Sequence, residues 1–166
     1  MGWWSYDVLG GDPALDALGD IAETCGVGYN SMSDEEDSEK ETYYGYDFHK
    51  VKDKLKTVKD IENLIKKCSY AFRDEYGEEV DYQVLGLVLM SVGNKIPKKI
   101  KDKIIKSIKN DEWAKECTER KEAMDNYLKV MESYVGKDIP VILNQKGLFE
   151  SLNEHIQSGN KGLLNK

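Results

Sequence analysis

The chain has 166 residues, with 24 lysines and arginines against 31 aspartates and glutamates, which gives a net charge of −7. Hydrophobic residues make up 40% and charged residues 33% of the chain, so we expect one single domain over residues 1–166. The longest run without a charged or strongly polar residue, 84–92, is about half as long as a membrane-spanning helix, and we expect no export leader in the first residues. We therefore expect a cytoplasmic protein with no membrane partner.

The cysteines and histidines are few and widely separated. None of Cys25, Cys68, Cys117, His49 and His155 stands in a metal-binding or Cys-x-x-Cys spacing. We expect three free thiols, as is typical of a reducing compartment, and no bound cofactor.

The N-terminal part reads as an apolar arm followed by a helix. Asp12 and Pro13 are typical of a helix start, with Asp12 as N-cap, and apolar residues then recur at helical spacing. The pattern predicts a helix over 13–25 that is ended by Gly26 and Gly28. We expect the arm to pack onto the helices through Trp3, Trp4, Tyr6, Val8 and Leu9.

Residues 31–42 are strongly acidic and have almost nothing to bury, so we expect a mobile surface loop. Tyrosines follow the loop; tyrosine is a common interface anchor, and the adjacent carboxylates could steer a partner toward it. The same tyrosines, with Phe48, could instead be core residues. The predicted interface residues are Asp34, Glu35, Glu36, Asp37, Glu39, Glu41, Tyr43, Tyr44 and Tyr46.

The rest of the chain is dominated by helical periodicity. Thr57 and Asp60 resemble a capping box, so the helical pattern over 47–76 predicts one helix or two. The helix predicted over 80–92 is apolar nearly all round and is expected to be central, whereas 139–143 is predicted to be a short extended segment. The predicted fold is an all-α bundle of about five to seven helices, with the further helices over 47–76, 80–92, 97–109, 113–134 and 146–157.

The opening residues carry a family resemblance. The motif M-G-x-W at 1–4 and the motif D-x-A-x-D at 12–16 resemble an uncharacterised bacterial family, a domain of unknown function that begins M-G-x-W-G-x-G-x-F-x-N-D-x-A-x-D. Residues 84–108 repeat that family's order of apolar helix, glycine turn and amphipathic helix. The resemblance implies a small helical domain of bacterial or phage origin and no reaction. The chain departs from the pattern at Ser5, Leu9 and Gly11.

Acidic residues recur along the first helix. Asp12, Asp16 and Asp20 stand four residues apart, with Asp7 nearby, and carboxylates on one helix face could hold Mg²⁺ for a metal-dependent enzyme. The simpler alternative is that acids near a helix N-terminus favour its dipole and face water. No phosphate loop, nucleophile elbow or zinc motif accompanies them, so we expect no metal and no catalytic residues.

The stretch 95–109 is rich in lysine, with seven lysines against Asp102. Such a helix could contact the phosphates of a nucleic acid, although it lacks arginine and interleaved aromatic residues. A solvated helix face is the alternative interpretation. The predicted basic face consists of Lys98, Lys99, Lys101, Lys103 and Lys106.

Charge layout and the lack of catalytic motifs favour a non-enzymatic protein-interaction module. One form would be a bacterial or phage-encoded inhibitor that binds a host or defence enzyme through its acidic surface, which predicts a protein partner with a basic surface. A metal-dependent enzyme and a nucleic-acid-binding module are the alternatives. The sequence gives no indication of oligomeric state.

Overall fold

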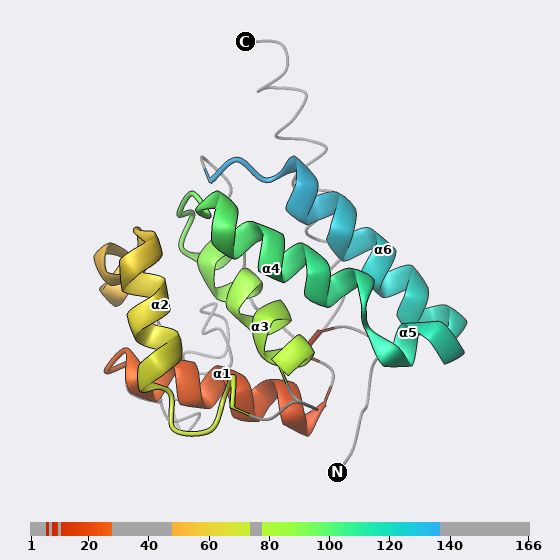
Figure 1. Cartoon of the computed structure of the whole chain (residues 1–166), viewed down its shortest axis with the longest axis horizontal. Coiled ribbons are helices and arrows are strands. Elements are labelled where there is room, and N and C mark those ends of the chain that lie inside the picture. Colours follow the sequence, from red (N-terminus) through yellow and green to blue (C-terminus); the bar gives the residue numbers. More distant parts are fainter. Residues whose placement is uncertain (1–5, 7, 10, 28–47, 74–77, 137–166) are drawn as a thin grey trace, which may run out of the picture.

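A computed structural model describes residues 6, 8–9, 11–27, 48–73 and 78–136 of the chain. Within these residues the fold is all-α, as predicted, with six α-helices, one 3₁₀ helix and no strand. None of the described helices is both long and apolar enough to span a membrane. In chain order the elements are α1 (Asp12–Thr24), η2 (Phe48–Leu55), α2 (Val58–Lys67), α3 (Glu78–Ser91), α4 (Lys98–Lys109), α5 (Glu112–Glu116) and α6 (Thr118–Ser133) (Figure 1).

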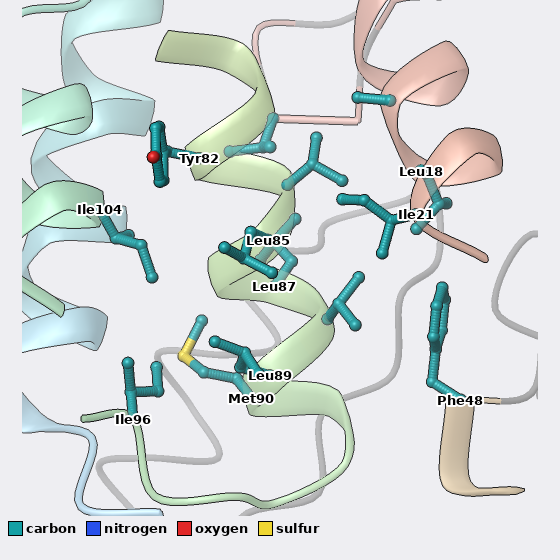
Figure 2. Packing of buried hydrophobic residues seen from close by; sticks show 14 of the residues in the cluster. Leu18, Ile21, Phe48, Tyr82, Leu85, Leu87, Leu89, Met90, Ile96 and Ile104 are labelled. Carbon is teal, nitrogen blue, oxygen red and sulfur yellow. The ribbon is translucent and has the colours of Figure 1, made fainter. Parts of the chain in front are cut away.

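The central element is α3, as its composition predicts. Every residue from Asp81 to Val92 is buried, because α3 is apolar nearly all round and is enclosed by α1, α4 and η2. Figure 2 shows Leu18 of α1 and Phe48 of η2 on one side of α3, and Ile104 of α4 on the other. Burial of each such side chain contributes roughly 1.5–3 kcal/mol, so this cluster is the main source of stability.

Helix α1 begins one residue earlier than predicted. Its N-cap is Gly11, without a side-chain cap, and Asp12 is the first helical residue, so the prediction of Asp12 as N-cap is wrong. Its end is confirmed: Gly26 adopts a left-handed φ of 77°, and the Val27 N–H donates to the Ala22 carbonyl. This is a Schellman motif, which glycine permits at little steric cost.

The stretch predicted as helical over 47–76 contains a break and ends early. Thr57 caps α2 in the predicted capping box, with the Asp60 N–H donating to Thr57 Oγ1 at 3.0 Å. The helix stops at Lys67, so the prediction that it continues to Tyr76 is wrong. The backbone N–H groups of 69–71 instead donate to the buried carboxylate of Asp20, which offers them an alternative to helical hydrogen bonds.

Helix α4 follows the predicted pattern. It begins after Pro97, which cannot donate a backbone hydrogen bond, and it places Ile100, Ile104 and Ile108 in the core at four-residue spacing.

The helix predicted over 113–134 is two helices. Cys117 has an extended backbone, with φ −129° and ψ 117°, so α5 ends before it and α6 begins after it. Asp111 caps α5, because its carboxylate accepts from the Ala114 N–H at 2.9 Å. Met124 and Tyr127 are buried on the inner side of α6, whereas Val135, which follows the helix, is 56% exposed.

Part of the N-terminal arm packs as expected. Val8 and Leu9 are buried, whereas Tyr6 is 43% exposed. Trp3 and Trp4 lie outside the described residues, as do the predicted loop 31–42, the segment 139–143 and the helix 146–157.

Candidate functional site

An open cleft of about 280 Å³ lies between the C-terminal end of α4, α5 and the N-terminal half of α6. Its floor is apolar and is formed by Ile108, Ala114, Met124 and Leu128. Three lysines line the same cleft, one from each helix: Lys109, Lys115 and Lys121. It therefore combines apolar surface with positive charge.

One face of α6 lines this cleft. Lys121, Met124, Asp125 and Leu128 are spaced three and four residues apart, which places them on one side of a helix. The break at Cys117 turns α6 away from the axis of α5, so this face and α5 form two different walls.

A buried ion pair holds together the helices that form the cleft. Arg120 is 1% exposed, and its Nη2 donates to Asp111 Oδ2 at 2.8 Å. Arg120 Nε also donates to Asp111 Oδ1, at 3.3 Å. Burial raises the pKa of the Asp111 carboxyl, but the hydrogen bonds and charge of Arg120 lower it by more, so its pKa lies below the ordinary value. Asp111 is therefore a charged carboxylate whose charge is compensated within the protein.

Gln83 of α3 completes this network. Its Nε2 donates to Asp111 Oδ2 at 3.0 Å and to the Ser107 carbonyl at 3.2 Å, while its Oε1 accepts from Arg120 Nη2 at 3.1 Å. All the polar side-chain atoms of Gln83 thus have partners inside the protein, as buried polar groups require. The network joins α3, α4, α5 and α6.

The N-terminal arm is tied to the same network. Arg120 Nη1 donates to the Tyr6 carbonyl at 2.8 Å, across 114 residues of sequence. The Arg120 guanidinium lies 5.0 Å from the centre of the Trp113 ring, and that ring lies 5.5 Å from the ring of Tyr6. The helices that form the cleft are therefore held in place by a network in which Asp111 lines the cleft, whereas Tyr6, Gln83, Trp113 and Arg120 do not.

The predicted basic face on α4 is exposed, but its first two lysines have acidic neighbours. Lys98 Nζ lies 3.4 Å from Asp102 Oδ2 on the same helix. Lys99 Nζ lies 3.4 Å from Glu62 Oε2 of α2. Exposed pairs of this kind contribute about 0–1 kcal/mol, so they orient the lysines without fixing them.

Two further lysines of this face also make contacts within the protein. Lys101 Nζ donates to the Tyr134 carbonyl at 3.3 Å, and Lys103 Nζ lies 5.8 Å from the centre of the Tyr82 ring. Lys106 is exposed. Four of the five lysines of the predicted basic face thus contact other groups of the chain.

The proposed carboxylate set on α1 does not assemble. Asp12 and Asp16 are exposed, whereas Asp20 is only 2% exposed and points inward; Asp7 lies outside the described residues. Among the described residues no three side chains of histidine, cysteine, aspartate or glutamate gather as a metal site would require.

Asp20 instead holds the loop that follows α2. Its Oδ1 accepts from the Ser69 N–H at 3.2 Å, and its Oδ2 accepts from the N–H groups of Tyr70 and Ala71 at 3.2 and 2.8 Å. Both oxygens are thereby used in a structural role, and the prediction that Asp20 shares an exposed face with Asp12 and Asp16 is wrong.

The acidic and aromatic residues predicted as an interface all lie outside the described residues. This holds for Asp34, Glu35, Glu36, Asp37, Glu39, Glu41, Tyr43, Tyr44 and Tyr46.

The sequence interpretation missed both Arg120 and the cleft. A signal for Arg120 was present, because it stands at helical spacing from Ala123, Met124 and Tyr127 on the apolar side of α6. The cleft had no local signal, because its residues come from three helices and its shape depends on the break at Cys117.

Comparison with known proteins gives no match: no family model, no curated protein and no solved structure resembles the chain.

Proposed function

We propose that the chain is a protein-binding module that engages a partner protein at the cleft between α4, α5 and α6. The observation that carries the proposal is the combination of an apolar floor, exemplified by Leu128, with lysines from all three helices. Protein interfaces pair an apolar centre with a polar rim in the same way, and a cleft accepts the anchoring side chain of a partner.

The buried network under the cleft supports this proposal. Because Arg120, Asp111 and Gln83 fix α5 and α6 against α3, the cleft walls are held together before a partner arrives. A preformed site loses less conformational entropy on binding than a site that must first be ordered.

The alternatives from the sequence receive less support from the described residues. A metal-dependent enzyme would need the α1 carboxylates, and both carboxylate oxygens of Asp20 accept hydrogen bonds from the loop after α2. A nucleic-acid-binding module would use the lysines of α4, and this helix carries neither an arginine nor an aromatic residue that could contact bases. The proposal that residues 34–46 bind a partner with a basic surface, for instance as an enzyme inhibitor, stays a prediction.

Site-specific photo-crosslinking tests the proposed function. We would place a photoreactive amino acid at Asp125 in the cleft and, as a matched control, at Asn63 on the exposed side of α2. In an extract of the cells that carry the gene, the Asp125 variant should give one adduct of defined mass, and the Asn63 variant should not. The captured protein, once purified, should bind the chain in calorimetry, and Leu128→Ser should weaken that binding.

An equal yield of adducts from both positions would contradict the proposal. So would the absence of any adduct from Asp125 while the chain runs as a monomer in the same extract.

A further inference from the structure

The lysines of the cleft differ in what they contact. Lys115 Nζ lies 2.9 Å from Glu112 Oε1, and Lys121 Nζ lies 3.1 Å from Asp125 Oδ2, each one turn away on its own helix. Lys109 is exposed at the end of α4 and has no ion-pair partner among the described residues. The cleft therefore offers one cation without a counter-charge and two whose counter-charges are exposed carboxylates.

Lys115 and Lys121 can exchange their carboxylate partners, Glu112 and Asp125, for the carboxylates of a ligand. The side chains of Lys115 and Lys121 are 58% and 65% exposed, and exposed pairs contribute at most about 1 kcal/mol. A carboxylate that enters the cleft together with an apolar side chain would meet these lysines in a less hydrated setting, where charge pairs are stronger.

The second carboxylate at the cleft does not oppose such a ligand strongly. Asp111 accepts from the Ala114 N–H on one oxygen and from Arg120 on both, so its negative charge is neutralised by a buried cation. The balance of charge that faces an incoming group is set by the three lysines against two exposed carboxylates, Asp125 in the cleft and Glu112 beside Lys115.

We infer that the cleft binds an acidic segment of the partner protein, in which carboxylates meet the lysines and an aliphatic or aromatic side chain occupies the apolar floor. This inference rests on the proposed function and names the chemistry of the partner. Charge complementarity selects an acidic segment, and the floor formed by Ile108, Met124 and Leu128 selects an apolar anchor.

The apolar floor also favours a peptide over a nucleic acid. A phosphate backbone would pair with the lysines but would leave the partly exposed Leu128 without an apolar partner. Binding to the cleft should therefore depend on charge and on the apolar anchor together, whereas binding of a polyanion should depend on charge alone.

Synthetic peptides and the purified full-length chain test the inference. The probe is a short fluorescent peptide of glutamate and leucine, with two control peptides in which glutamine replaces every glutamate or serine replaces every leucine. We expect only the peptide of glutamate and leucine to bind. In NMR spectra of the protein, the amide shift changes on binding should be confined to α4, α5 and α6. A single-stranded DNA of equal charge serves as the third control.

Variants of the chain give the decisive readout. Lys109→Glu should weaken binding of the peptide about three- to tenfold, whereas Lys59→Glu, the same change at an exposed lysine of α2, should not. Asp125→Asn removes the opposing carboxylate and should tighten binding about two- to fivefold, a gain that a damaged fold would not produce.

Three results would overturn the inference: equal binding of the glutamine peptide, equal effects of Lys109→Glu and Lys59→Glu, or DNA binding that is as strong and as sensitive to Lys109→Glu. If no peptide binds and photo-crosslinking at Asp125 still captures a protein, the acidic-segment inference fails and the proposed function stands. If the crosslink fails as well, both fail.

Discussion

Asp111 and Arg120 form an ion pair that is almost completely buried, at 4% and 1% exposed. Asp111→Asn would remove the carboxylate that pairs with the buried Arg120 cation. We expect the free energy of unfolding to fall by about 3–5 kcal/mol, as is usual when one partner of a buried pair is removed. Urea unfolding followed by circular dichroism measures this loss.

Asp125→Asn is the matched control for Asp111→Asn, because its carboxylate is exposed and pairs only with Lys121. It should change the free energy of unfolding by less than about 0.5 kcal/mol. Similar losses for the two variants would contradict the structural role assigned to the buried pair.

The same pair predicts a pH dependence with a definite sign. The pKa of Asp111 in the folded protein lies below its value of about 3.9 in unfolded chains, so the charged carboxylate stabilises the fold. This stabilisation is complete above about pH 4 and is lost as the pH falls through the folded-state pKa. We therefore expect the stability difference between wild type and Asp111→Asn to stay constant from about pH 6 to about pH 4 and to shrink at lower pH. A difference that stays constant below about pH 4 as well would show that the charge of Asp111 has no part in it.

At the scale of elements, the loop after α2 depends on a single side chain of α1. Asp20→Ala would remove the acceptor of the Ser69, Tyr70 and Ala71 N–H groups, so we expect this loop to open. The free energy of unfolding should drop by about 2–3 kcal/mol. Trypsin should then cleave after Arg73, which is exposed in this loop, much faster than in wild type.

Asp16→Ala is the control for the loop, because its side chain lies on the same helix and is exposed. It should leave both the rate of cleavage and the stability unchanged. Slow cleavage of Asp20→Ala would mean that Asp81, which accepts from the Phe72 N–H at 2.7 Å, holds the loop without Asp20.

The elements also show what sequence patterns capture. Local signals were sufficient for α3 and α4, where an apolar run and four-residue isoleucine spacing agree with the final packing. They failed at Cys117, since the break between α5 and α6 is stabilised by Asp111 and Arg120, which meet only in the folded protein. They failed at Asp20 because its four-residue spacing from Asp16 indicates only that the two residues share a helix face. The backbone N–H groups that Asp20 binds are distant in the sequence, so no local pattern reveals its burial.

On the scale of the whole molecule, the enclosure of α3 predicts a gradient of local stability. The amides of residues 84–90 lie in the most buried helix, so we expect them to exchange with solvent only through global unfolding. Helix α5 has five residues and no buried side chain, so its amides should exchange much faster. Hydrogen exchange followed by NMR measures both, and exchange of α3 as fast as that of α5 would contradict α3 as the centre of the fold.

The candidate cleft is likewise a property of the whole molecule. None of its lysines was singled out by the sequence for a cleft, because Lys109, Lys115 and Lys121 belong to helices whose mutual angles are fixed by the buried network. The class of fold follows from periodicity, whereas a site between elements follows from their packing angles, which a single sequence does not state.

The full enclosure of α3 has a consequence for how its orientation is chosen. A helix that is apolar on every side can rotate about its own axis without exposing more hydrocarbon, so hydrophobicity alone leaves its azimuth undecided. Asp81 and Gln83 are about 200° apart around the axis, and they bond to the loop after α2 and to the Arg120 network respectively. Gly86, where a Cβ would overlap the Tyr127 hydroxyl, fixes the same azimuth by shape. Asp81, Gln83 and Gly86 together allow one orientation of α3 about its axis. Because Gln83 and Gly86 contact α6, this orientation also sets the direction of the α6 face that lines the cleft.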